Sequence, residues 1–173
     1  TGYAQVEHDA IGMRLLPPGP RVTRFGESLQ VIRELCDTGS CNFRGEHHQI
    51  AMDDFGIRPV QSHIPFLVGG HGRRVVSLAG RHADIFQFTG LTHAEDGSPS
   101  GGGFAIEHIR ARARWLADAA GERNEDIERS ALVQVTAVGA EAHAETLATE
   151  RLAQYADVLE ETPFMLSGTL EQI

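Results

Sequence analysis

The residues best suited to chemistry in this sequence form a glycine-rich turn, Gly69-Gly70-His71-Gly72, which is followed at once by Arg73 and Arg74. An apolar run precedes the turn and a helical pattern follows it, so we expect the turn where a buried strand ends and a helix begins. Glycines let a backbone approach an anion, the first N–H groups of a helix point at such an anion, and arginines add bidentate contacts. The segment therefore predicts a site for an anion such as a phosphate.

Two familiar nucleotide-binding fingerprints do not fit this turn. A dinucleotide motif G-x-G-x-x-G requires glycine at position 75, where Val75 stands instead. A P-loop requires G-K-[ST], which does not follow. A purely steric turn with solvated arginines is the alternative. His71 could donate to a phosphate, but we expect it to be a solvent-exposed residue of the turn.

A second series of residues, Cys36, Cys41, His47 and His48, has side chains that bind metals. Its C-x4-C-x5-H-H spacing matches none of the strong zinc templates, and Cys36 falls at the end of a helical pattern. We therefore expect no metal site here, but a buried thiol and surface histidines.

The bulk composition is that of an acidic globular chain. The sequence has 173 residues, a length typical of one domain, with 41% hydrophobic and 23% charged residues. Its formal charge is -9, from 24 acidic and 15 basic residues, which argues against non-specific binding to nucleic acid or to anionic membranes. No apolar run approaches the ~18 to 20 residues of a membrane helix, and no basic-then-apolar leader is visible. The composition predicts a soluble, cytoplasmic domain.

The order of the expected elements indicates an α/β fold. Apolar residues at steps of three and four predict helices over residues 22–35, 75–82, 106–120 and 148–159. Near-continuous apolar runs predict buried strands over residues 64–68, 83–88 and 131–138. Alternating strands and helices indicate a parallel sheet, but periodicity leaves open a doubly wound sheet and a (β/α)8 barrel.

Two further patterns concern a loop and the last residues. The run DGSPSGGG predicts a flexible loop at Asp96–Gly103. Thr169 and Gln172 fit a capping box, in which the two side chains satisfy backbone groups at the start of a helix. Because this start lies one turn from the last residue, we expect the chain to be a segment of a longer protein.

Five segments, taken in order, resemble the luciferase-like monooxygenase superfamily, specifically its bacterial branch associated with coenzyme F420. They are GYAQVEHDAIGM, PPGPRVTRFGESLQVIREL, FRGEHHQI, RPVQSHIPFLVGGHGRRVVSLAGRHADI and SGTLEQI, of which the fourth is the most specific. The resemblance implies a (β/α)8 TIM barrel that binds a flavin or deazaflavin at the C-terminal ends of its strands. It also implies that residues 1–173 are a single partial domain around strands 5 to 7, with strands 1 to 4 and strand 8 absent.

The resemblance further implies which residues form the site. The phosphate-bearing tail of the cofactor, coenzyme F420 or alternatively FMN, is expected against the glycine-arginine turn, on Gly69, Gly70, Gly72, Arg73 and Arg74. Gly2 and Tyr3, after strand 4, are expected to line the same site. Thr89, just after strand 6, is expected to contact an anionic substrate. Neither catalytic residues nor metal ligands are identified.

Two hypotheses about function follow. The first is part of an oxidoreductase that transfers hydride to or from a small organic substrate, or oxygenates it, with the cofactor supplying the chemistry. The chain alone is then expected to be inactive, because the residues that donate or accept protons belong to the absent strands. The second is an inactive half-barrel that forms homo-oligomers through its exposed sheet edges. An open-sheet anion-binding module unrelated to flavins is a third alternative.

Overall fold

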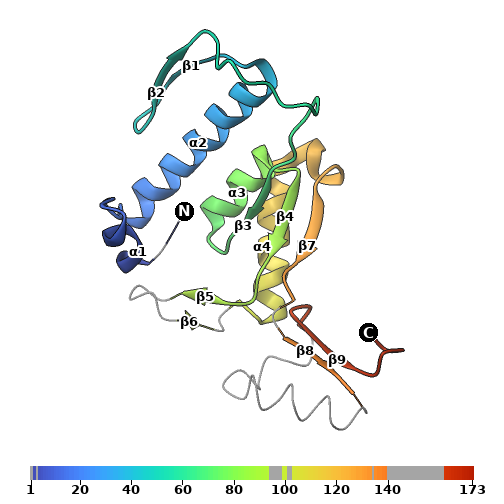
Figure 1. Cartoon of the computed structure of the whole chain (residues 1–173). Helices are drawn as coiled ribbons and strands as arrows, with labels where there is room; N and C mark the ends of the chain where they lie inside the picture. Colours follow the sequence, from blue (N-terminus) through green and yellow to red (C-terminus); the bar gives the residue numbers. More distant parts are fainter. Residues whose placement is uncertain (1, 3, 94–98, 101–102, 134, 140–161) are drawn as a thin grey trace.

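Helices and short strands alternate along the chain, as Figure 1 shows. The computed structural model describes residues 2, 4–93, 99–100, 103–133, 135–139 and 162–173. The helices are α1 (Gln5–Ala10), α2 (Pro18–Thr38), α3 (Arg73–His82) and α4 (Ile106–Ala120), and a 3-10 turn covers Gly121–Glu125. The strands are β1 (Cys41–Arg44), β2 (Gln49–Met52), β3 (Leu67–Gly69), β4 (Ile85–Phe88), β5 (Thr92–His93), β6 (Pro99–Ser100), β7 (Glu128–Ala131), β8 (Val135–Val138) and β9 (Met165–Gly168).

The central sheet is parallel, in the order β3-β4-β7. Val68 is opposite Phe86 in the register of β3 and β4, and Phe86 is opposite Arg129 of β7. A second parallel pair joins β8 to β9, whereas β1 with β2 and β5 with β6 are antiparallel hairpins. Since parallel neighbours need a crossover, α3 and α4 are the connections that make β3, β4 and β7 consecutive βα units. The predicted α/β class with a parallel sheet is confirmed.

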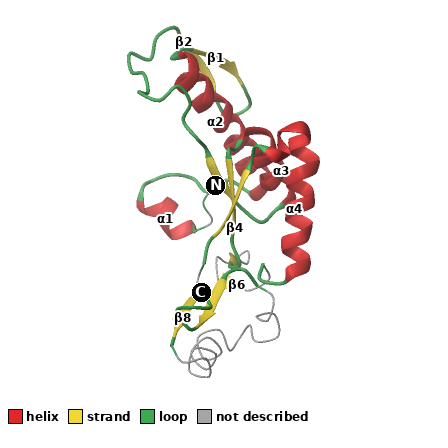
Figure 2. Cartoon of the chain, turned by 90° about the vertical axis from the view of Figure 1, so that its right-hand side faces the viewer, coloured by secondary structure: helices red, strands yellow, loops and turns green. Residues whose placement is uncertain are grey.

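The core lies between this sheet and the helices α3 and α4, which pack side by side against one of its faces (Figure 2). Val68 and Phe86 from the strands and Val76 and Leu116 from the helices are all buried there. The opposite face differs, because Leu67 of β3 is 53% exposed. The strands therefore bury alternate residues, as strands with one covered face do, and the expectation of two covered faces is wrong for β3.

The helix predicted over residues 22–35 is confirmed as α2 and is longer at both ends. Pro18 is the first helical residue, where a missing N–H costs nothing because that group has no intrahelical partner. Gly39 ends the helix with a φ of 71°, a left-handed conformation that glycine adopts without strain, and its N–H donates to the Leu35 carbonyl.

The boundaries of two predicted strands need correction, and one strand was not predicted. The expected strand over 64–68 begins only at Leu67, because the Ile64 carbonyl and the Phe66 N–H hydrogen-bond to side chains, and only the Phe66 carbonyl bonds to the backbone beside β4. The expected strand over 131–138 is two strands, β7 pairing with β4 and β8 pairing with β9. No strand was expected after residue 161, yet β9 lies there, parallel to β8.

The remaining expectations concern a loop and the last residues. Within the predicted loop at 96–103, Pro99–Ser100 forms β6, and residues 96–98 and 101–102 lie outside the described residues. The helix predicted over 148–159 also lies outside them. One half of the predicted capping box is present, because the Thr169 N–H donates to Oε1 of Gln172 over 2.7 Å. In the described part of the chain, no helix is long and apolar enough to cross a membrane.

Glu27 joins α2 to the turn of the β1–β2 hairpin. Its carboxylate is buried and accepts hydrogen bonds from three consecutive backbone N–H groups, those of Glu46, His47 and His48, over 2.7 to 2.9 Å. Burial alone would raise the pKa of Glu27, but these N–H donors outweigh it and lower the pKa overall. The segment FRGEHH thus folds around a carboxylate from a helix about twenty residues earlier in the chain.

Replacing Glu27 with glutamine is expected to lower the midpoint of thermal unfolding at pH 7, because an amide cannot accept from three N–H donors as an ion does. A lowered pKa places this stabilisation above the ordinary pKa of glutamate, and it is lost as the pH falls through the folded value. The difference from the wild type should therefore shrink in acid. Glu46→Gln, whose side chain is 69% exposed, is the control and should unfold as the wild type does.

Candidate functional site

The glycine-rich turn joins β3 to α3. None of its glycines has a positive φ, so a left-handed backbone does not explain them. Gly72 is the N-cap of α3 with a φ of -73°, and a Cβ added there would meet nothing within 4 Å. Any residue could adopt this conformation, and the fold leaves the space beside Gly72 open. Neither backbone conformation nor packing therefore requires glycine at position 72.

The first backbone N–H groups of α3 face this open space without a partner. Within the described residues, no hydrogen bond engages the N–H of Arg73, Arg74 or Val75, and Gly72 has no side chain to cap them. Such groups carry the positive end of the helix dipole and bind anions readily. The turn thus has the donors and the room that a phosphate needs.

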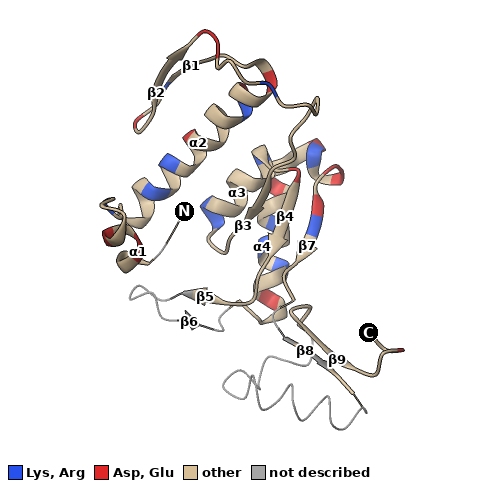
Figure 3. Ribbon diagram, viewed as in Figure 1, with Lys and Arg blue, Asp and Glu red and all other residues tan. Residues whose placement is uncertain are grey.

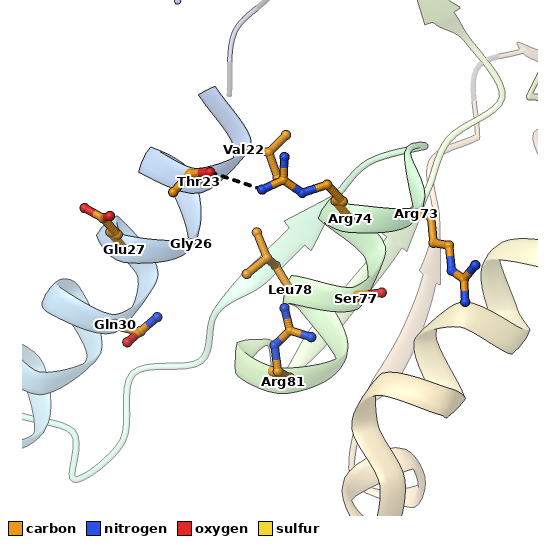
Figure 4. A pocket seen from close by; sticks show the side chains of 10 residues that line it. All are labelled: Val22, Thr23, Gly26, Glu27, Gln30, Arg73, Arg74, Ser77, Leu78 and Arg81. Carbon is orange, nitrogen blue, oxygen red and sulfur yellow. Dashed lines mark hydrogen bonds between the residues drawn. The ribbon is translucent and has the colours of Figure 1, made fainter. Parts of the chain in front are cut away.

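The two arginines after the turn point in different directions (Figure 4). Arg74 donates to the Gly19 carbonyl and to Oγ1 of Thr23, both over 3.1 Å, so its guanidinium is tied to α2. Arg73 points away from α2 and makes no hydrogen bond or ion pair within the described residues. Of the two side chains, Arg73 is therefore the one available to an anion at the turn.

A cavity of about 450 Å³ lies between α2 and α3. Figure 3 colours the basic positions of both helices, and the three that line the cavity, Arg73, Arg74 and Arg81, all belong to α3. Every residue that lines it belongs to α2 or α3, so it lies outside the strand ends. The lining residues are Val22, Thr23, Gly26, Glu27, Gln30, Arg73, Arg74, Ser77, Leu78 and Arg81.

At the C-terminal ends of β3 and β4, three polar side chains form a hydrogen-bonded chain. Thr89 follows β4 directly, and its Oγ1 lies 2.9 Å from Nε2 of His71 in the glycine turn. Nδ1 of the same imidazole lies 2.9 Å from Nη1 of Arg112 on α4. The turn after one strand and the residue after its parallel neighbour are thereby held together. The expectation that His71 is solvent-exposed is wrong, because it is partly buried in this network.

Arg112 is the residue of this network that the sequence did not reveal. It is 2% exposed and donates to three carbonyls, those of Thr89 (2.8 Å), Gly103 (2.7 Å) and His108 (3.2 Å). Burial lowers the pKa of Arg112 from its ordinary value. No carboxylate among the described residues lies within ion-pair distance of its guanidinium. Arginines are almost never fully buried without such a partner, so this position calls for an explanation.

A second cavity, of about 170 Å³, lies beside this network. Unlike the larger one, it includes residues from the glycine turn and from the segments that follow β4 and precede α4. It is lined by His71, Thr92, Gly103, His108, Ala111, Arg112 and Trp115.

The other predicted site residues do not join this network. Gly2 is exposed with a φ of 67°, and no hydrogen bond within the described residues links it to the glycine turn. Tyr3 lies outside the described residues. The series of cysteines and histidines is dispersed among other partners, since Cys41 donates to Glu34 and His48 contacts Ser28. No cluster of three or more metal-binding side chains occurs in the part of the chain that the structure describes.

Comparison with known proteins gives this site its context. The sequence profile of luciferase-like monooxygenases matches residues 1–170. The chain belongs to the luciferase-like monooxygenase family. It is 33% identical over 93 residues to pyrimidine monooxygenase RutA of Allorhizobium ampelinum, a match that covers 52% of this chain and 24% of RutA.

Two solved structures show that the fold is also that of this family. Riboflavin lyase RcaE, solved with modified FMN and riboflavin, matches 88% of this chain and 37% of its own, with a TM-score of 0.64 and 13% identity. The coenzyme F420-dependent tetrahydromethanopterin reductase of Methanopyrus kandleri matches 80% of this chain and 40% of its own, with a TM-score of 0.56 and 18% identity. The chain therefore has the α/β fold of luciferase-like TIM-barrel enzymes, and it spans less than half the length of these two proteins.

Proposed function

We propose that this chain is the phosphate-binding part of a luciferase-like oxidoreductase that uses a flavin or coenzyme F420. The observation that carries the proposal is the N-terminus of α3, where three N–H groups have no partner among the described residues and the space beside Gly72 is open. An anionic tail placed there receives hydrogen bonds from the backbone and charge from Arg73. In this assignment the chain corresponds to the region of strands 5 to 7 of the barrel.

The cofactor supplies hydride transfer or oxygen chemistry when it is bound. The chain's own contribution is to hold and orient it. Gly69, Gly70 and Gly72 let the backbone approach the phosphate, and Gly2 and Tyr3 line the same site. Thr89, at the end of the neighbouring strand, contacts a small organic substrate. The membership of the family and the named relatives, one with FMN and one dependent on F420, support this class of cofactor.

A carboxylate at position 72 separates phosphate binding from stability. Gly72→Asp is expected to weaken FMN binding at least tenfold, because the new carboxylate repels the phosphate and accepts from the same N–H groups. It should not weaken the binding of riboflavin, which has the same ring system without the phosphate. The variant should unfold at the same or a higher temperature than the wild type, because aspartate is a good N-cap.

The measurement is the fluorescence of FMN, riboflavin and F420 during titration with the protein that carries this chain, as wild type, Gly72→Asp and Gly72→Ala. Alanine adds a methyl group without charge and is expected to bind FMN within a few-fold of the wild type. If Gly72→Asp lost affinity for FMN and for riboflavin equally, the phosphate would bind elsewhere. Binding of neither FMN nor F420 by the wild type would overturn the proposed function.

The uncovered sheet face favours a second candidate, an inactive half-barrel that associates with itself. Leu67 on that face is 53% exposed, and among the described strands β3 and β7 each pair on one side only. Exposed apolar surface and unpaired strand edges favour association. Light scattering on the isolated 173-residue chain should then give a mass of at least a dimer, and assays with either reduced cofactor should give no turnover. A monomer that binds the cofactor tightly would contradict this candidate.

A further inference from the structure

Arg112 holds three segments of the chain at the ligand-binding end of the sheet. Its guanidinium donates to His71 in the turn after β3, to the carbonyl of Thr89 after β4, and to the carbonyl of Gly103 before α4. A fully buried cation with no carboxylate among the described residues adds little to stability by charge pairing. The role of Arg112 therefore follows from where its guanidinium N–H groups point rather than from its charge.

The protons of this network can be assigned from the donors alone. Arginine has N–H donors and no acceptor, so Nδ1 of His71, 2.9 Å from Nη1 of Arg112, must accept through its lone pair. A neutral imidazole with an acceptor at Nδ1 carries its proton on Nε2. That Nε2–H donates to Oγ1 of Thr89, 2.9 Å away.

The direction of these hydrogen bonds determines whether the Thr89 hydroxyl donates to a ligand or accepts from it. Its oxygen already accepts from His71, so its hydroxyl proton points elsewhere. Within the described residues no acceptor takes that proton, and the side chain is only partly buried. A threonine in this state is a hydrogen-bond donor, and it suits a ligand oxygen of a carboxylate, carbonyl or phosphate.

We propose that Arg112 is a positioning residue that fixes His71 as the Nε2–H tautomer and thereby makes the Thr89 hydroxyl a donor to an oxygen of the bound ligand. This inference rests on the proposed function for the presence of a ligand at Thr89. It names a chemical preference that the function alone does not contain, namely that the group bound at Thr89 is an acceptor.

The tautomer is measured directly by NMR of the full chain with ¹⁵N-labelled histidine, with the His71 signals assigned by their loss in His71→Asn. The wild type should show His71 as a single tautomer with an unprotonated Nδ1 and a protonated Nε2. Arg112→Lys, which keeps a donor, should preserve it, whereas Arg112→Leu should give a mixture of tautomers. An Nδ1–H tautomer or a mixture in the wild type would overturn the proposal, and this result needs no cofactor.

Inorganic phosphate serves as the oxygen probe for the second half of the proposal. It should shift the His71 signals saturably in the wild type and in Thr89→Ser, and bind at least fivefold more weakly to Thr89→Val, which loses one hydrogen bond to an anion. No saturable shift in the wild type, or equal binding by Thr89→Val, would overturn this half.

Repeating the titration with bound FMN identifies the source of the oxygen, which is the cofactor phosphate if FMN abolishes the response and the substrate if it does not. Because the tautomer is read without cofactor, failure of the proposed function and failure of this inference give different results.

Discussion

Replacing Asp84 with alanine is expected to lower the free energy of unfolding by roughly 3 kcal/mol, within the range for breaking a largely buried charge pair. Asp84 lies just before β4, at the end of the sheet opposite the glycine turn. Its carboxylate accepts from Arg33 of α2 over 2.8 Å, from the backbone N–H of Phe66 over 2.7 Å, and contacts His63 over 2.8 Å. One side chain therefore ties α2 and the residues before β3 to the start of β4.

The alanine variant removes the acceptor that these partners share, and it leaves Arg33 with only the more distant carboxylate of Asp37, 3.7 Å away. Arg33 stacks over the ring of Phe66, 3.8 Å from its centre, and also donates to the Ile64 carbonyl, so it is held beside the empty position. Removing one member of such a network costs more than the pair contributes, because the remaining charge is poorly solvated. Asp84 is 26% exposed, and this access to water keeps the expected loss below that of a fully buried pair.

Urea denaturation at pH 7 measures this loss, and Asp54→Ala provides the control. Asp54 also pairs with an arginine, Arg58, over 3.0 Å, but its side chain is 71% exposed. Exposed pairs contribute about 0 to 1 kcal/mol, so Asp54→Ala should change the free energy of unfolding by less than about 1 kcal/mol. Equal losses in the two variants would show that burial of the Asp84 network is unimportant.

The pH dependence provides an independent check on Asp84. Burial alone would raise its pKa, but the donors on Phe66, His63 and Arg33 outweigh this and hold the pKa below the ordinary value of 3.8. A carboxylate with a lowered pKa stabilises the fold above the ordinary value, and that stabilisation is lost as the pH falls through the folded value. The difference between wild type and Asp84→Ala should therefore be constant near neutrality and shrink below about pH 4. A difference that grows in acid would contradict the ion-pair explanation.

The elements that the sequence predicted well are those whose pattern depends only on residues close together in the chain. The apolar stripe of α2, its proline start and the glycine at its end depend only on neighbouring residues, and so does the glycine turn before α3. The meeting of His71 and Thr89 was also foreseeable, because each follows one of two neighbouring parallel strands whose C-terminal ends lie at the same edge. The prediction of an anion site at that edge rested on the same geometry.

The features that were missed depend on partners that no local pattern specifies. Arg112 lies three residues after Ile109 and four before Leu116, so its spacing places it on the buried face of α4, but no local pattern shows which groups its guanidinium contacts there. Strand β7 begins with the polar residues Glu128 and Arg129, which are exposed, so its first half is not part of an apolar run. The role of Glu27 depends on backbone N–H groups of a distant hairpin turn. In each case the partner is distant in the sequence, and only the tertiary fold brings it near.

Replacing Gly80 with alanine is expected to lower the free energy of unfolding by about 2 kcal/mol, although alanine is favoured over glycine in a helix by about 1 kcal/mol. Gly80 is buried in α3 where it touches α4. A Cβ added there would lie 2.7 Å from the Leu116 carbonyl oxygen and 2.9 Å from Cβ of Ala119. Since the nearest atom is backbone, no side chain can rotate away, and the two helices must separate.

The matched control is Gly19→Ala in α2, where an added Cβ would meet only the end of the Arg74 side chain at 3.7 Å. That variant should unfold within about 1 kcal/mol of the wild type, because the preference of a helix for alanine is offset by crowding between the new Cβ and the following Pro20. Urea denaturation compares the two, and a Gly80→Ala variant as stable as Gly19→Ala would show that α3 and α4 can move apart at little cost.

The same clash should affect the end of the sheet that carries the glycine turn. The helix α3 follows the turn that contains His71, and α4 carries Arg112. We therefore expect separation of the two helices at Gly80 to lengthen the 2.9 Å contact between these two side chains. In any Gly80→Ala molecules that stay folded, His71 should be a mixture of the two tautomers, as we expect for Arg112→Leu. A folded variant with the wild-type tautomer would mean that the network at the turn adjusts independently of the helix packing beneath it.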